Sequence, residues 1–225
     1  NGSASVSFNN GQRVAGSNSQ FFRMAETNGR IWFSIDNENA FNQILIGMLE
    51  EATFNEDRLY DAVKMPSINE VSLAAMANQR QHAIMAFPPP EGVHTVPLMV
   101  RVTEDGYYDF KANTMEDFGD YEVVFNDIIS NLTVPLFEGA TISVYLDEGE
   151  HYNRFYLNFQ QNTITGVESL ENIKFFAQSI NSELRLQLSG KELLKGTLEI
   201  LDAAGKTILT KDNLLVVEGI TKVAI

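Results

Sequence analysis

Hydrophobic and polar residues alternate with a period of two along most of the chain. In the first clear example, Ile31, Phe33 and Ile35 alternate with Trp32, Ser34 and Asp36. Successive side chains of a strand point to opposite faces, so this pattern predicts strands with one buried face. The same pattern recurs with turn residues at short spacing, which is typical of a β-sandwich, and it predicts strands at residues 31–35, 96–102, 108–112, 121–125, 132–134, 142–146 and 155–159.

Two polar turns lie between pairs of these predicted strands. Glu104-Asp105-Gly106 separates residues 96–102 from residues 108–112, and an acidic turn at residues 147–150 separates 142–146 from 155–159. Short polar turns with glycine commonly join antiparallel neighbours. We therefore expect a hairpin at each place. Pro97 suggests an edge position or a strand start, since proline cannot donate to the ladder.

Two segments are compatible with either a helix or a strand. Residues 41–51 carry apolar side chains at helical spacing, and residues 67–70 resemble a capping box that would open a helix. Val71, Leu73, Ala75 and Ala77, however, share one face of a strand, and residues 78–81 can turn the chain back. Isolated short helices also fit poorly inside a sandwich, so strands are favoured at both places.

The alternating pattern restarts at Ile173, after a polar stretch that begins near residue 160. We expect the boundary between two domains near Gly166. The sequence thus predicts an all-β protein of two consecutive antiparallel β-sandwich domains, residues 1–165 and residues 166–225, of which the second is smaller and immunoglobulin-like.

Composition and charge exclude several classes of protein. The chain has 30 acidic and 16 basic residues, a formal net charge of -14, and no cluster of Lys and Arg. Nucleic-acid binding requires such clusters, so no nucleic-acid partner is expected. The absence of cysteine excludes disulfides and thiolate metal sites. No apolar run approaches the roughly 18 residues of a membrane span, so no span is expected. The start at Asn1 without a signal segment favours a processed product or an excerpt.

No set of residues forms a recognisable catalytic motif. The carboxylates gather in predicted turns, where solvated side chains are the ordinary case and a Ca²⁺ site is the alternative. His82, His94 and His151 lie far apart and outside any metal motif, and no serine stands in a strand-elbow motif. We expect no enzyme activity and no cofactor, with Ca²⁺ as a weak alternative.

Several aromatic side chains are candidates for a ligand platform. Trp32, Tyr107 and Tyr108 lie in or next to predicted strands, and stacking of a sugar on such rings is one use of an exposed sheet face. Further aromatic candidates are Tyr121, Tyr145, Tyr152 and Tyr156. The more common use of tyrosine on a sandwich is to cover the sheet itself. A glycan- or ligand-binding adhesin module at residues 1–165 is therefore an alternative, and a hydrolase fragment is a third.

The last segment combines a strand at residues 197–201, the turn Asp202-Ala-Ala-Gly205-Lys206, and a strand from Gly219 to Ile225. Gly205 can supply the positive φ that such a turn needs, and Asp202 can accept hydrogen bonds from the amides of the turn. This order resembles the Por secretion system type A C-terminal sorting domain, which is carried by cargo of the Bacteroidetes type IX secretion system. The matching positions are Leu198, Ile200, Asp202, Gly205, Lys206, Gly219, Val223 and Ile225.

The region upstream extends this resemblance over residues 20–160. Its order and spacing are similar to those of a β-sandwich often found just before sorting domains in large Bacteroidetes surface proteins. The segments that carry the similarity are residues 30–33, 40–47, 60–64, 96–98, 106–108 and 149–159.

The resemblance implies a role in export and supplies no catalytic residues. It implies that the chain is the non-catalytic C-terminal tail of a secreted or cell-surface protein, with residues 1–165 as a stalk or presentation module. The last domain would be the signal that the outer-membrane translocon and its shuttle recognise. By the same resemblance, a sortase-like peptidase removes this domain in many cargos while the cargo is attached to surface lipopolysaccharide.

Overall fold

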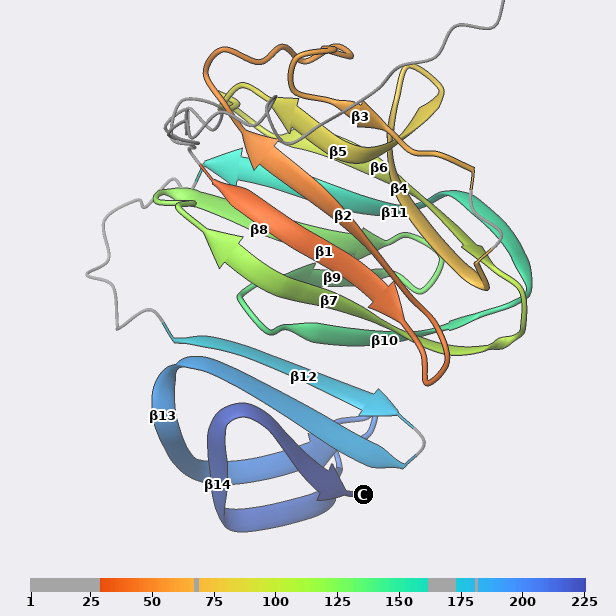
Figure 1. The fold of residues 1–225 in the computed structure, drawn as a ribbon. Helices are drawn as coiled ribbons and strands as arrows, with labels where there is room; N and C mark the ends of the chain where they lie inside the picture. Colours follow the sequence, from red (N-terminus) through yellow and green to blue (C-terminus); the bar gives the residue numbers. More distant parts are fainter. Residues whose placement is uncertain (1–28, 67–68, 162–172, 181) are drawn as a thin grey trace, which may run out of the picture.

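The computed structural model describes residues 29–66, 69–161, 173–180 and 182–225. These residues form strands in two sheets and contain no helix, which confirms the all-β class (Figure 1). Accordingly, nothing in this part of the chain is a helix that could span a membrane. The strands are β1 (Arg30–Asp36), β2 (Phe41–Met48), β3 (Ala62–Val63), β4 (Val71–Ala77), β5 (Arg80–Phe87), β6 (His94–Val102), β7 (Gly106–Glu116), β8 (Tyr121–Asp127), β9 (Leu132–Pro135), β10 (Thr141–Leu146), β11 (Gly149–Gln161), β12 (Lys174–Ile180), β13 (Glu183–Leu201) and β14 (Thr207–Ala224).

The larger sheet folds over itself into two layers. Its strand order is β10-β7-β1-β2-β5-β4-β6-β11-β8-β9, with β3 attached to β5. In Figure 1, β1, β2 and β7 lie in front of β6, β8 and β11. Ring contacts join the layers, because Phe33 of β1 lies 5.8 Å from Phe125 of β8 and Phe110 of β7 lies 4.9 Å from Phe155 of β11. The larger sheet is thus a sandwich with a single aromatic core.

The alternating residues of the sequence form this core. Ile31, Phe33 and Ile35 are fully buried; on the opposite face of β1, Trp32 and Asp36 are partly exposed, whereas Ser34 is buried. Burying one such side chain contributes about 1.5–3 kcal/mol relative to leaving it in water. The fully buried phenylalanines come from both layers and are Phe33, Phe87, Phe110, Phe125, Phe155 and Phe159.

Both segments that were compatible with a helix are strands. β2 buries Ile44, Ile46 and Met48 at alternate positions, and β4 pairs with β5 as a hairpin. The two turn residues between them, Asn78 and Gln79, have φ values of 48° and 62°. Positive φ at both central positions is what a two-residue type I′ turn requires.

Both predicted hairpins around the polar turns are wrong. β6 pairs with β4 and β11, whereas β7 pairs with β1 and β10. Likewise, β10 pairs with β7, while β11 pairs with β6 and β8. Each turn carries the chain from one layer to the other. The alternating pattern could not reveal this, because it only sets which face of a strand is buried.

One strand pair departs from the expected antiparallel arrangement. β2 and β5 are parallel, with Leu45 opposite Ile84 and Met48 opposite Phe87. Parallel neighbours need a long connection. The chain between these strands supplies it, since it contains the 49–61 loop, β3 and β4.

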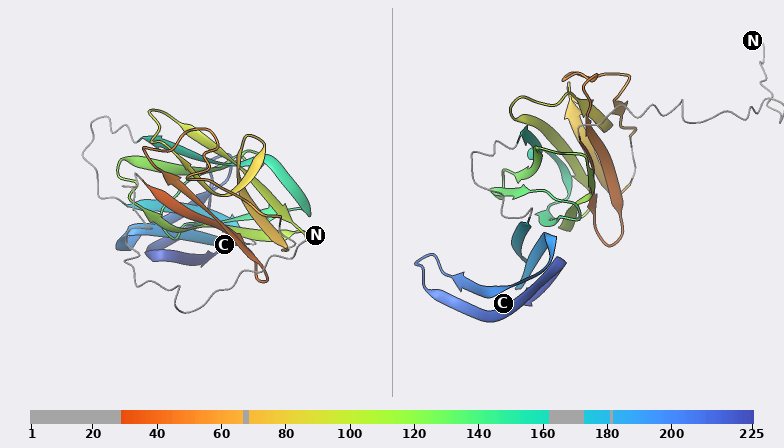
Figure 2. Two further views of the ribbon diagram at one scale, coloured as in Figure 1. Left: turned by 45° about the horizontal axis from the view of Figure 1, so that its top comes forward. Right: turned by 90° about the vertical axis from the view of Figure 1, so that its left-hand side faces the viewer.

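The smaller sheet has the order β12-β13-β14 and is antiparallel. It consists of three strands, two of them long, instead of many short ones. β13 and β14 shift register between Leu188 and Leu193, and the long hairpin curls there (Figure 2). Lys211 Nζ consequently donates to Ala224 O at 3.1 Å, although both belong to β14. The curl encloses a small core of Leu186, Leu188, Val216 and Val223. The predicted boundary between residues 165 and 166 lies outside the described residues.

Candidate functional site

Strand β10 forms one edge of the larger sheet, and the smaller domain lies against it. β10 pairs with β7 on one side only. Figure 1 shows β12 running beside β10. An edge strand presents a row of backbone N–H and C=O groups that no ladder satisfies. The contacts of these groups are therefore the first feature of the site.

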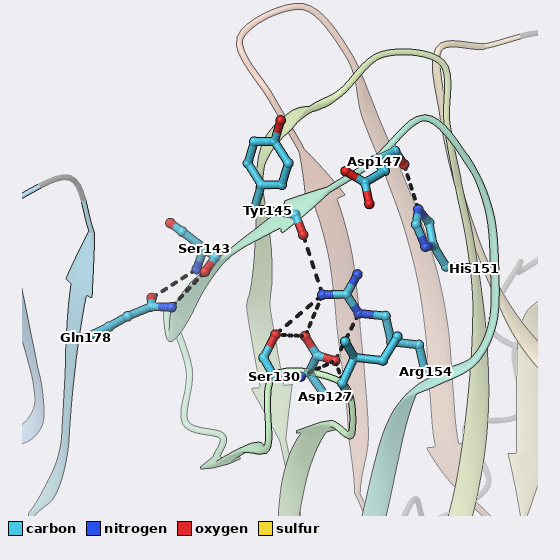
Figure 3. Close-up of polar contacts among 9 residues, drawn as sticks. Asp127, Ser130, Ser143, Tyr145, Asp147, His151, Arg154 and Gln178 are labelled. Carbon is cyan, nitrogen blue, oxygen red and sulfur yellow. Dashed lines mark hydrogen bonds and ion pairs between the residues drawn. The ribbon is translucent and has the colours of Figure 1, made fainter.

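Two glutamine side chains of the smaller domain satisfy the edge of β10. Gln187 Oε1 accepts a hydrogen bond from Thr141 N at 2.8 Å, and Gln187 Nε2 donates to Thr141 O. Gln178 Oε1 accepts from Ser143 N at 3.0 Å, and Gln178 Nε2 donates to Ser143 O at 2.6 Å (Figure 3). Thr141 and Ser143 are two residues apart, so their backbone groups face the same side. The two primary amides take the place of a neighbouring strand.

Charged and apolar contacts surround the glutamine pairs. Arg185 Nη1 donates to Ser143 Oγ at 3.0 Å, and that hydroxyl in turn donates to Asp109. Lys174 Nζ donates to Leu136 O at 3.4 Å. Phe176 of β12 packs against the core of the larger domain. The docking contact thus combines an apolar anchor with directed polar bonds, as protein interfaces commonly do.

A buried ion pair lies farther along the same edge. Arg154 Nε donates to Asp127 Oδ1 at 2.9 Å, and Arg154 Nη2 donates to Asp127 Oδ2 at 2.8 Å (Figure 3). Arg154 Nη2 also lies 3.4 Å from Tyr145 O, so it reaches the edge of β10. Ser130 Oγ donates to Asp127 Oδ2 at 2.8 Å. This cluster connects β8, β10 and β11 across the two layers.

The surroundings of Asp127 favour its ionised form. Burial by itself would raise the pKa of this carboxyl, but the hydrogen bonds from Arg154 and Ser130 and the charge of Arg154 outweigh burial and lower the pKa. Arg154 lies in a bulge of β11 between His151 and Phe155, and from there its guanidinium reaches Asp127. Since both oxygens of Asp127 are occupied, the pair is suited to holding the strands together.

A polar cleft of about 350 Å³ lies where the two domains meet. Lys111 forms an ion pair with Asp36 at 2.7 Å on one of its walls. Tyr107 is half exposed there, and its ring stands edge-on to Tyr145 at 5.3 Å. The smaller domain closes the other side of the cleft, which is lined by Asp36, Asn37, Glu38, Tyr107, Asp109, Lys111, Ser143, Ile180 and Arg185.

The structure does not bring the three predicted platform residues together. Trp32 lies on the outer face of β1 under the guanidinium of Arg30, 5.3 Å from its ring. It pairs with Thr114, seven residues along β7 from Tyr107, which is about 23 Å of strand. Tyr108 is buried, and its hydroxyl donates to Glu104 O at 2.8 Å. Of the three, Tyr107 is the one that lines the cleft between the domains.

The ring that accompanies Tyr107 is Tyr145, one of the further aromatic candidates from the sequence. The two residues are opposite each other in the β7–β10 pair. Their proximity follows from the register of that pair. The sequence did not reveal it, because it predicted that β7 pairs with β6.

The turn between β13 and β14 has the local geometry that the sequence predicted for Asp202 and Gly205. Asp202 Oδ1 accepts hydrogen bonds from Ala204 N and Lys206 N, both at 2.9 Å. Gly205 has a φ of 81°, and its N–H donates to Asp202 O at 2.9 Å. The carboxylate therefore organises an exposed turn at the tip of the domain.

The other motif residues are spread over the smaller domain. Leu198 and Ile200 are partly buried in β13, and Val223 is buried in β14. Gly219 lies at the curl of β14 with a φ of 91°. Ile225 is half exposed, and its N–H donates to Ser182 O at 3.1 Å. These residues shape the domain and do not converge on one point.

An open apolar groove of about 370 Å³ lies between the curled halves of the smaller sheet. Phe175 of β12 is 53% exposed at this groove, opposite Leu194 and Leu198 of β13. Large apolar side chains open to water commonly mark an interaction surface.

The three histidines have different surroundings. His82 is buried and neither of its ring nitrogens has a hydrogen-bond partner among the described residues. His94 packs between the rings of Phe54 and Phe87, at 5.0 and 4.2 Å, and this burial lowers its pKa. His151 Nε2 lies 2.8 Å from Asp147 O. Within the described ranges, no three His, Asp or Glu side chains are grouped to hold a metal ion.

These features define an all-β protein in which a folded β-sandwich carries a smaller curled sheet on one edge. The chain belongs to the family described as Domain of unknown function (DUF8693), whose model matches residues 1–159. The match ends within β11, the last strand of the larger sheet. Comparisons with curated proteins and with solved structures gave no match.

Proposed function

We propose that this chain is the non-catalytic C-terminal tail of an exported Bacteroidetes protein, and that the smaller domain is the signal read by the type IX secretion machinery. The observation that carries the proposal is the turn between β13 and β14. There an Asp202 carboxylate caps the amides of Ala204 and Lys206, and Gly205 supplies the positive φ. A rigid, exposed turn of this kind is a suitable recognition feature.

The surface of the smaller domain supports a role in recognition. Its apolar groove is open, with Phe175 half exposed, and Leu193, Leu215 and Val217 are also about half exposed on β13 and β14. Leu193 and Val217 are directly paired across the two strands. A small domain with this much exposed apolar surface fits a transient partner such as a translocon or its shuttle.

The larger domain would then present whatever precedes it at the cell surface. Its core is extensive and its polar network is occupied by internal contacts, which suits a stalk. Removal of the smaller domain by a sortase-like peptidase and attachment to lipopolysaccharide are further parts of this proposal.

Export of a fluorescent fusion tests the proposal. Residues 1–225 are fused behind a fluorescent protein in a Bacteroidetes host with an active type IX system, next to a fusion that ends at residue 165. We expect the complete fusion outside the outer membrane and the truncated one in the periplasm. Gly205→Val should reduce export, whereas Gly92→Ala, in an exposed loop of the larger domain, should not. Periplasmic retention of the complete fusion beside an exported reference cargo would contradict the proposal.

A second candidate function is glycan binding in the cleft between the domains. The specific observation is Tyr107, which is half exposed, held edge-on by Tyr145 and surrounded by Asp36, Lys111 and Arg185. Stacking on an aromatic ring combined with charged hydrogen-bonding groups suits a sugar. Signal on a glycan array that is lost in Tyr107→Ala and kept in Trp32→Ala would support this function. Equal signal from both variants would contradict it.

A further inference from the structure

We propose that the edge of β10 is a strand-pairing surface which the smaller domain covers, and that an uncovered β10 pairs with β10 of a second copy of this chain. Gln178 and Gln187 are the residues through which the cover bonds to the backbone of β10. This interaction surface is separate from the export signal.

The two edges of the larger sheet differ in how their own sequences protect them. β9 has four residues and ends in Pro135, and both features hinder the addition of a further strand. β10 has six residues, Thr-Ile-Ser-Val-Tyr-Leu, without a charge or a proline. A run of this kind, rich in β-branched and aromatic residues, is a good template for pairing. Of these two described edges, β10 is therefore the one that needs a cover from elsewhere.

The cover bonds to β10 through side chains, and the backbone of another strand could form the same hydrogen bonds in their place. Each glutamine offers one acceptor and one donor to one residue of β10, as one residue of an antiparallel neighbouring strand would. Thr141 and Ser143 would keep the same number of hydrogen bonds if a strand took the place of Gln187 and Gln178. Two antiparallel copies of β10 related by a two-fold axis offer each other these groups.

Charges near the edge favour the cover over a second copy. Glu138 precedes β10, and Asp147 and Glu148 follow it, all exposed. Two antiparallel copies would bring these acidic ends together. The smaller domain instead brings Lys174 and Arg185 to the edge. Pairing between copies should accordingly become stronger as salt screens the repulsion.

Removal of the smaller domain would uncover β10. That such a removal takes place in the exported protein rests on the proposed function. An exported chain that loses its last domain would then gain the capacity to pair at the surface. The smaller domain would act both as the export signal and as a temporary cover of the β10 edge.

The test uses the full chain with Gln178→Ala and Gln187→Ala combined. Hydrogen exchange is measured at the amides of Thr141 and Ser143, and mass by sedimentation from low to high micromolar concentration. We expect exchange at both amides to accelerate at least tenfold at the lowest concentration, and a dimer at the highest, more so at 0.5 M than at 0.05 M salt. Gln160→Ala, which removes a β11 glutamine that donates to Glu122 of β8, is the matched control and should remain monomeric and protected.

Two further variants keep the result decisive. Gln178→Ala alone should accelerate exchange at Ser143 more than at Thr141, so the effect can be read even if the double variant is unstable. Adding Ser143→Pro to the double variant removes an N–H that points away from β7 and should restore the monomer. Protected amides in the double variant, a monomer despite rapid exchange, or a dimer that persists with Ser143→Pro would each overturn the inference. None of these readouts depends on export, so failure of the export proposal remains distinguishable.

Discussion

The guanidinium of Arg154 and the carboxylate of Asp127 form two parallel hydrogen bonds of 2.9 and 2.8 Å in a site where Asp127 is 1% exposed. Asp127 ends β8, and Arg154 lies within the bulge of β11. The same guanidinium lies 3.4 Å from Tyr145 O of β10. One ion pair therefore connects two strands of one layer to the edge strand of the other.

Removing one partner of this ion pair should lower the free energy of unfolding much more than removing both partners. Arg154→Met leaves the charge of Asp127 buried and unpaired, and we expect the free energy of unfolding to fall by about 3–5 kcal/mol. The double variant Asp127→Leu with Arg154→Met removes both charges and should lose clearly less. Urea denaturation of the three proteins measures these differences. Equal losses in the single and double variants would contradict this account.

Stability should decline in acid because of Asp127. Its pKa in the folded chain lies below the ordinary value of 3.8, since the bonds from Arg154 and Ser130 outweigh burial. The ionised carboxylate thus stabilises the fold above pH 3.8, and this contribution is lost as the pH falls through the lower pKa of the folded state. Denaturation between pH 2 and pH 6 should show a steeper loss in the native chain than in Asp127→Leu with Arg154→Met. The same dependence of stability on pH in both proteins would argue against this role of Asp127.

His94 should add a separate pH dependence nearer neutrality. Burial between Phe54 and Phe87 lowers the pKa of His94 from 6.5, so the unfolded chain binds a proton more readily than the folded one. Stability should therefore fall as the pH drops below about 6.5. His94→Phe should flatten this part of the profile, and Phe54→Ala, which uncovers the ring, should reduce its slope. A slope unchanged in His94→Phe would assign the effect to another group.

Gly29 should not tolerate a side chain. Its φ is 129°, and a Cβ at this position would lie 2.7 Å from Phe118 Cδ1 and 2.8 Å from Met48 Cε. Backbone strain and overpacking each cost about 1–3 kcal/mol, so Gly29→Ala should lower the melting temperature by several degrees. Gly92→Ala is the control, because no atom lies within 4 Å of the added Cβ. Similar melting temperatures for the two variants would contradict the packing described for Gly29.

The strands and their buried faces were accessible from the sequence because period-two alternation is a local property. Ile31, Phe33 and Ile35 were predicted as one face of a strand and form part of the core. The hairpin turn at Asn78 and Gln79 was accessible for the same reason, since a turn depends on its own few residues.

The cleft was only partly predictable. Tyr107 was selected as an aromatic candidate, but its position beside Tyr145 depends on the register of β7 and β10. Tyr108 was selected with it and is buried. A dipeptide in a strand always places one side chain on each face, so only one of these neighbours could belong to a surface site.

By itself, the sequence determined the all-β class, the buried face of most strands of the larger sheet, and the capped turn at Asp202 and Gly205, because each depends on residues close together in the chain. Only the tertiary structure decided which strand lies beside which, and that Gln178 and Gln187 would meet Ser143 and Thr141. The physical reason is that strand pairing uses backbone groups common to all residues, so the identity of a partner is set by how two layers close around a shared core.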